Sequence, residues 1–349
     1  MKITFRHYNE SDPIPLSYVS QIPAVSGIVS AVYDVRPGGV WSRESIAKIK
    51  ENANRHNLSF EVVESVPVHE DIKLGKKSRI GYIDAYCENV RRLAEYGIKV
   101  ICYNFMPVFD WLRSDLSYEN PDGSRSLIYK QEQINRLDPS KTKLSLPGWD
   151  ESYTDDGLRA LLSEYENVGH KELFENLSYF LRAVIPVCEE VGIKMAIHPD
   201  DPPRDVFGLP RIIKDEQTLD AMLSAYNSEC NGITLCTGSL GADRKNDVPY
   251  LTEKYCRMNR TPFIHVRNIR LENECDFYET AHPTECGSLD IRRIMKILYD
   301  NGYDGYIRPD HGRMIWGETG KPGYGLYDRA LGAMYLHGLW QGFGGFAKT

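Results

Sequence analysis

The chain has 349 residues, of which 42% are hydrophobic and 26% are charged, and this is the composition of a globular protein with a large core. Its formal charge of −7 disfavours binding to nucleic acid or to an anionic membrane, because both need clustered Lys and Arg. A small-molecule partner is favoured instead. No apolar stretch approaches a membrane span and the opening MKITFRHYNE lacks a secretory pattern, so we expect a cytoplasmic protein.

The eight cysteines are scattered along the chain, without CxxC pairs or a compact framework. In a chain of this size we expect reduced thiols and no disulfides. For most of them the ordinary role is that of a small buried side chain. They are Cys87, Cys102, Cys188, Cys230, Cys236, Cys256, Cys275 and Cys286.

Short runs rich in β-branched residues recur along the chain, and each one ends at a polar or turn-forming sequence. Such runs are typical of buried strands. We predict eight strands, namely KITFRHY (2–8), GIVSAVYDV (27–35), SFEVVESV (59–66), IKVICYNF (98–105), KMAIHPD (194–200), GITLCTG (232–238), PFIHVRNI (262–269) and GYIRPDH (305–311).

Segments with apolar residues spaced by three and four lie between these strands and predict helices. Ser42 is a plausible N-cap, Gly192 a plausible C-terminal stop, and Ser288 a plausible cap of the penultimate helix. The predicted helices span 16–21, 42–56, 78–96, 173–192, 216–226, 248–257, 290–301 and 327–340.

The alternation of strands and helices predicts a parallel sheet, and eight units favour closure into a single (β/α)8 TIM barrel over residues 1–349. No GxGxxG follows the first strand, so a dinucleotide-binding fold has no support. From residue 106 to about 170 the rhythm breaks. We expect one partly helical insertion there, which serves either as a lid or binding element or as a surface for oligomer contacts.

The carboxyl ends of the strands in such a barrel converge on one face. Strands five to eight end in His198, Cys236, His265 and Asp310. Imidazole, thiolate and carboxylate are all ligands of divalent transition metals, and each would stand on a rigid strand end. The pattern predicts a metal site with open positions for substrate oxygens, unlike a closed structural zinc centre.

Each of these four residues alone has an ordinary explanation. A histidine at a strand end is usually a satisfied polar residue, Cys236 alone would be a core residue, and Asp310 alone would cap the following turn. The metal interpretation rests on four such residues at equivalent places in four successive repeats.

Other polar residues near these strand ends are candidates for the chemistry. His311 cannot easily point to the same place as Asp310, so it suits a general acid or base, and Tyr324 could contribute a phenol or simply pack a loop. Arginines beside a metal suit an acid substrate, although each is equally explained by a structural role. The candidates for substrate contact are His7, Arg267, Asn268, His282, Arg308 and Arg313.

The chain resembles the mannonate dehydratases, a family of the hexuronate pathway, through blocks that follow one another over essentially its whole length. Taken together these blocks are specific, whereas any one alone is not. They are FRHY, VWSRESI, ESVPVHEDIKLG, YNFMPVFDWLRSDL, IHPDDPP, TLCTGS, FIHVRN, AHPTECGSLDI, RPDHGR and PGYGLYDRALGAMYLHGLWQG.

The resemblance implies a (β/α)8 lyase that dehydrates D-mannonate, an aldonic acid, to 2-keto-3-deoxy-D-gluconate in glucuronate catabolism, with Mn2+ or Fe2+ as cofactor. It places the metal ligands at the same four strand ends and the acid/base pair at His311 and Tyr324. It also implies a homodimer.

Two other functions compete with this expectation. A sugar isomerase or epimerase of the xylose-isomerase type would have the same barrel, but such enzymes line their metal site with several carboxylates, and here only Asp310 stands in place. A non-catalytic, metal-stabilised binding protein is disfavoured by the open site and by His311 next to a ligand.

Overall fold

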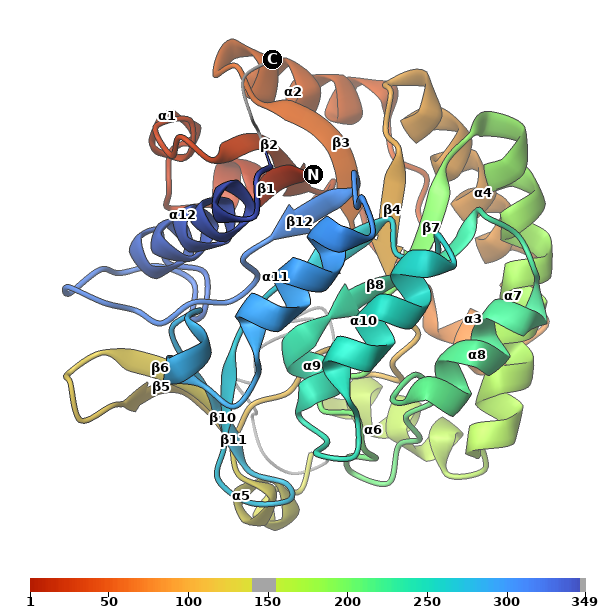
Figure 1. Ribbon diagram of the computed structural model, residues 1–349. Coiled ribbons are helices and arrows are strands. Elements are labelled where there is room, and N and C mark those ends of the chain that lie inside the picture. Colours follow the sequence, from red (N-terminus) through yellow and green to blue (C-terminus); the bar gives the residue numbers. More distant parts are fainter. Residues whose placement is uncertain (140–154, 346–349) are drawn as a thin grey trace.

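The computed structural model describes residues 1–139 and 155–345. Eight parallel strands close into a barrel in the order β1-β12-β9-β8-β7-β4-β3-β2 (Figure 1), which confirms the predicted fold. The barrel strands are β1 (Lys2–Arg6), β2 (Val25–Ser30), β3 (Ser59–Glu64), β4 (Val100–Tyr103), β7 (Lys194–Ile197), β8 (Asn231–Cys236), β9 (Phe263–His265) and β12 (Tyr306–Arg308).

Helices surround the barrel (Figure 1), and every helix predicted from periodicity is present to within a few residues. The helices of the described residues are α1 (Leu16–Val19), α2 (Arg43–Arg55), α3 (Glu70–Lys73), α4 (Arg79–Glu95), α5 (Gln131–Arg136), α6 (Asp155–Tyr165), α7 (His170–Val191), α8 (Glu216–Ala225), α9 (Thr237–Gly241), α10 (Val248–Arg257), α11 (Ile291–Asp300) and α12 (Tyr327–Gly342).

Local chemistry sets the ends of these helices. Ser42 accepts a hydrogen bond from the Ser45 amide at the start of α2, and Gly192 ends α7 with a left-handed φ of 73°. The prediction for Ser288 was wrong, because Asp290 stands immediately before α11 and its side chain accepts from an amide of the first turn.

Two layers of apolar side chains hold the barrel. The larger one packs between the strands and the surrounding helices. A separate small cluster comes only from barrel strands and fills the interior, as the taper of such a barrel requires. Its members are Val29, Val62, Val100, Cys102, Ala196, Phe263 and Tyr306. The polar strand ends therefore stand on a rigid, packed support.

A second, antiparallel sheet lies beside the barrel, with the order β10-β11-β6-β5 (Figure 1). It joins the insertion after β4, which supplies β5 (Asp115–Glu119) and β6 (Arg125–Tyr129), to the hairpin after β9, which supplies β10 (Ile269–Leu271) and β11 (Phe277–Glu279). The insertion contains the helices α5 and α6, as expected, but the expectation missed its strands. Part of it, residues 140–154, lies outside the described residues.

The same sheet also holds the loop between β12 and α12. Arg125 and Met314 form an antiparallel bridge, in which each amide donates to the other residue's carbonyl at 2.9 and 2.8 Å. Three segments that are distant in sequence are thus tied together at one end of the barrel.

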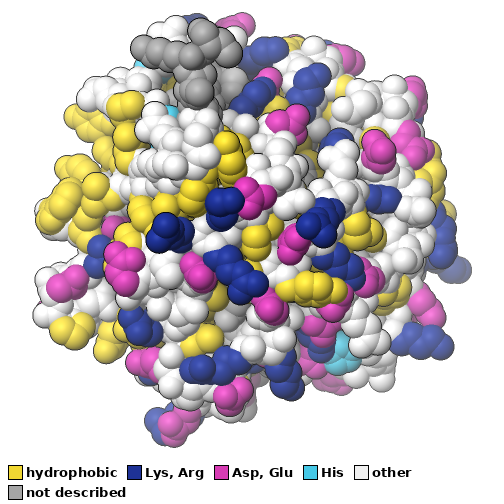
Figure 2. Space-filling view, viewed as in Figure 1, with side chains coloured by type: hydrophobic (Ala, Val, Ile, Leu, Met, Phe, Trp, Pro, Cys, Tyr) yellow, Lys and Arg dark blue, Asp and Glu magenta, His cyan; other side chains and the backbone are white. Residues whose placement is uncertain are grey.

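Several bulk expectations can be compared with the structure. None of the helices in the described part of the chain is both long and apolar enough to cross a membrane. All eight cysteines are free thiols. On the face shown in Figure 2, Lys and Arg side chains are interspersed with Asp and Glu, and they do not gather into a broad basic surface.

Candidate metal centre and active site

The ends of strands β7, β8, β9 and β12 bring the four expected ligands together. Donor atoms of His198, Cys236 and His265 lie within 4.8 Å of one another. Asp310 completes the group, because its carboxylate lies 3.6 Å from the Cys236 sulfur and 3.7 Å from His265 Nδ1. The convergence predicted from strand ends is therefore present in the structure.

A contact at the other ring nitrogen of each histidine orients the two imidazoles of this group. His198 Nδ1 lies 2.7 Å from the carbonyl oxygen of Pro199, so it carries the proton, and Nε2 points at His265 Nδ1 across 3.2 Å. The far nitrogen of His265 faces Glu64 at 3.4 Å. A carbonyl or carboxylate behind each ring is the usual support of a metal-binding histidine, so this observation fits a metal ion between the two rings.

The charges of the group also fit a cation. Burial by itself raises the pKa of the Cys236 thiol, but Arg267 and His198 outweigh burial and hold that pKa well below its usual value. Burial likewise raises the pKa of Asp310, and Arg308 and His311 more than reverse this effect. The thiolate and carboxylate forms, which bind metals, are therefore favoured.

A second set of donor atoms, from Glu64, Cys102 and His265, also lies within 4.8 Å. It is less suited to a metal. Burial keeps the pKa of the Cys102 thiol well above its usual value, so this sulfur stays a neutral thiol. Of the two sets, the one formed by strands β7, β8, β9 and β12 has the thiol whose pKa is lowered.

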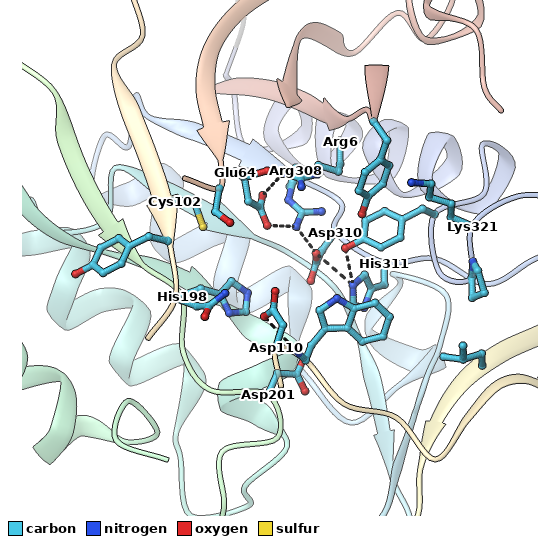
Figure 3. Close-up of a pocket in the computed structure, with 18 residues that line it drawn as sticks. Arg6, Glu64, Cys102, Asp110, His198, Asp201, Arg308, Asp310, His311 and Lys321 are labelled. Atoms are coloured by element: carbon cyan, nitrogen blue, oxygen red, sulfur yellow. Dashed lines mark hydrogen bonds and ion pairs between the residues drawn. The ribbon is translucent and has the colours of Figure 1, made fainter. Parts of the chain in front are cut away.

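His311 lies beside this group in a chain of hydrogen bonds. Its Nε2 is 3.1 Å from the Tyr324 hydroxyl, and its Nδ1 is 3.2 Å from the Glu279 carboxylate (Figure 3 shows His311 beside Asp310). Gly323, with φ of 77°, lets the loop turn tightly before Tyr324. Burial raises the pKa of Tyr324 well above its usual value, so its phenol stays protonated.

Glu279 belongs to a buried network that crosses from the second sheet to the barrel. Arg113 bridges Glu279 and Asp201 at 2.7 and 2.8 Å. Arg267 contacts both of these carboxylates and also Asp310, whose oxygen lies 2.7 Å from its Nε. This guanidinium is thus occupied by three carboxylates and does not line the cavity described below, and the substrate contact expected of Arg267 stays a prediction.

A cavity of about 410 Å3 opens over these strand ends. Of the six residues expected to contact substrate, Arg308 lines it, where it pairs with Glu64 and with Asp310 at 2.8 Å. The sequence reasoning missed several other lining residues, which are Arg6, Tyr8, Glu64, Cys102, Asp110, Trp111, Asp201 and Lys321. Arg6, Glu64 and Cys102 lie at or near the ends of β1, β3 and β4, so the strand-end argument extended to those strands would have found them.

The other four residues expected to contact substrate do not line this cavity, and their substrate contacts stay predictions. His7 and Asn268 bond the backbone of neighbouring loops, through Ile14 and Pro283, at 2.9 Å each. His282 lies 2.6 Å from the carbonyl of Pro309, and Arg313 forms an ion pair with Asp328 at 3.1 Å. These polar groups hold the loops that carry the site.

The insertion after β4 contributes three lining residues, Asp110, Trp111 and Leu116. The Trp111 ring lies 4.8 Å from the ring of His311. Burial raises the pKa of Asp110, and the nearby His198 partly offsets this rise. Of the two roles expected for the insertion, these contacts support a binding element.

The family model described as D-mannonate dehydratase (UxuA) matches residues 1–348. The chain belongs to the D-mannonate dehydratase family. Mannonate dehydratase of Streptococcus uberis is 52% identical over 98% of both chains, and mannonate dehydratase 2 of Halalkalibacterium halodurans is 51% identical over 98% of this chain and 99% of its own.

Solved structures agree with this membership. The crystal structure of mannonate dehydratase from Streptococcus suis serotype 2 has a TM-score of 0.92 and 46% identity, and the match covers 98% of this chain and 95% of that one. A D-tagatose 3-epimerase-like protein has a TM-score of 0.59 at 13% identity, with 99% and 98% covered, and this likeness shows the fold alone.

The buried network predicts a dependence of stability on pH. Burial raises the pKa of Glu279, but Arg267 and Arg113 outweigh it and bring the pKa to about 2, from a usual value of 4.5. A depressed folded-state pKa stabilises the protein above pH 4.5, and this contribution is lost as the pH falls toward 2. As the pH is lowered from 5 to about 3, we expect the free energy of unfolding, measured in urea, to fall less steeply in Glu279→Gln than in the wild type. The two slopes should differ by up to about 1.4 kcal/mol per pH unit.

The variant should also be less stable at neutral pH, because two buried guanidinium groups lose an anionic partner. Glu119→Gln, an exposed change in β5, serves as the control. Parallel pH profiles for the wild type and Glu279→Gln would show that folding does not lower the pKa of Glu279.

Proposed function

We propose that this protein is a metal-dependent lyase that dehydrates D-mannonate to 2-keto-3-deoxy-D-gluconate and water. Family membership supports this reaction. The single observation that carries it is that His198 and Asp310, two members of the donor set for a divalent metal, line the same cavity as the hydrogen-bonded pair His311 and Tyr324. The reaction removes a proton from C2 and the hydroxyl group from C3, and the enol product becomes the 2-keto acid.

His198, Cys236, His265 and Asp310 would hold the metal. A divalent ion held there supplies Lewis acidity, which makes the proton at C2, next to the carboxylate, easier to remove. We propose Mn2+ or Fe2+ as the cofactor because of the family resemblance. The mixed set of donors also accepts Zn2+, so the chemistry of the ligands does not select among these ions. Lys321, which lines the cavity and forms no ion pair with a described residue, is a cation available to the carboxylate of an anionic acid.

His311 and Tyr324 would carry out the two proton transfers. Tyr324, held as a protonated phenol by its burial, can give a proton to the departing C3 hydroxyl. His311 can accept the proton from C2, and Glu279 behind Nδ1 fixes the ring so that Nε2 faces Tyr324. The hydrogen bond between the two groups provides a path for returning the proton after each turnover.

The reaction itself is the first test. Purified protein supplied with Mn2+ should convert D-mannonate to a 2-keto-3-deoxy acid, detected as its semicarbazone, and removal of the metal with a chelator should abolish turnover. Full activity in metal-free protein would contradict the role of the metal.

The same assay separates the competing function. A sugar isomerase or epimerase has this barrel, and the fold is shared with such proteins at 13% identity or less. Turnover of aldose to ketose, without dehydration of any aldonic acid in a panel, would favour that function. Family membership disfavours it.

Two substitutions test the division of roles at the end of β8 and β12. Cys236→Ser should lose bound metal and activity together, because it removes a thiolate ligand. His311→Asn should keep the metal and lower kcat by roughly 100-fold or more, the scale of a lost acid/base catalyst. Metal content measured by atomic emission decides between the roles: loss of metal from His311→Asn would make His311 a ligand.

We further propose that the protein acts as a cytoplasmic homodimer with one catalytic domain per chain, which the family resemblance supports. Sedimentation equilibrium should give about twice the chain mass of 39.9 kDa. A single-chain mass at micromolar concentration would rule the dimer out.

A further inference from the structure

One carboxylate of the cavity has no ion-pair partner among the described residues. Four carboxylates line the cavity, and three of them, Glu64, Asp201 and Asp310, lie within 2.9 Å of an arginine nitrogen. Asp110 forms no ion pair with any residue that the structure describes. Because a carboxylate withdrawn from bulk water needs hydrogen bonds, this one is available to a ligand.

The backbone around Asp110 is held in place. The carbonyl groups of Phe109 and Asp110 accept hydrogen bonds from the buried Arg211, at 2.9 and 3.2 Å. Val108, two residues earlier, has a φ of 58°, which a β-branched residue rarely adopts. Strained backbone that the surroundings enforce is common where a side chain must be presented to a ligand.

The two oxygens of Asp110 differ. Oδ1 accepts a hydrogen bond from the amide of Trp111 at 2.9 Å, which fixes the side chain. Oδ2 has no hydrogen-bond partner in the described part of the chain. In Figure 3 the carboxylate projects into the cavity between His198 and Asp310, so the free oxygen faces the space beside the metal ligands.

We propose that Asp110 binds a hydroxyl group of the polyhydroxy acid directly and thereby selects substrates that carry a hydroxyl at that position. The inference rests on the proposed function, because it concerns the same cavity. A carboxylate only accepts hydrogen bonds and a substrate hydroxyl can donate one, so the pair is complementary. An acid that lacks this hydroxyl would leave the carboxylate unsatisfied, which is an effective form of discrimination.

Asp110→Asn separates this role from a structural one. The amide oxygen of Asn can still accept from the Trp111 amide, so the loop keeps its fixed side chain, whereas the free acceptor becomes an NH2 donor. We expect KM for D-mannonate to rise roughly 10- to 100-fold, the scale of a lost hydrogen bond to a charged group. Metal content and thermal stability should stay close to those of the wild type.

Aldonic acids that each lack one hydroxyl locate the contact. Calorimetry with the Mn2+-loaded protein should show that wild type binds one of these acids more weakly than D-mannonate, and that Asp110→Asn binds that acid as well as wild type does. The variant would then no longer distinguish D-mannonate from this acid as the wild type does, and this is the signature of a direct pairwise contact. Glu119→Gln, an exposed change in the same insertion, should match wild type throughout.

The outcomes distinguish the two proposals. Equal binding of D-mannonate by wild type and Asp110→Asn, or an equal loss with every acid in the panel, overturns the role of Asp110. Failure of the wild type to dehydrate D-mannonate overturns the proposed function, and the calorimetric comparison of the panel still decides about Asp110. If the metal-loaded wild type binds no acid of the panel, both proposals fall.

Discussion

The site depends on one buried guanidinium. Arg267, just beyond the end of β9, contacts Asp201, Glu279 and Asp310. All four side chains are buried. A buried charge without partners costs several kcal/mol, so each member of the group requires the others. The barrel, the loop after β7 and the second sheet therefore meet at one electrostatic centre, beside the donor atoms that would hold a metal.

This arrangement prepares the two anionic donors in their binding forms. Arg267 favours the thiolate of Cys236, and Arg308 favours the carboxylate of Asp310. Asp310 also has a φ of 58°, an unusual conformation for a residue other than glycine, so the packing around β12 aims its carboxylate at the expense of backbone strain. Geometry and charge are thus both set by the protein before a cation arrives.

The repeating units of the barrel could be predicted from sequence because apolar residues recur with different periods in strands and in helices. The donors at the ends of β7, β8, β9 and β12 could be predicted because parallel strands of a barrel end on one face. Position beside a strand end does not tell which way a side chain points. For that reason His7 and His282 were expected in the cavity but bond backbone carbonyls instead. Asp110 and Glu279 lie in insertions with no periodic signal, and the pairing of Tyr324 with His311 needed the family resemblance or the structure.

The second sheet has a consequence for motion. Its strands carry Glu279 on one side, and through the bridge between Arg125 and Met314 they hold the loop that leads to Tyr324. Both hydrogen-bond partners of His311 are therefore tied to this sheet, Glu279 as a residue of β11 and Tyr324 through the loop that follows Met314. A local opening of the sheet would loosen both contacts of the imidazole.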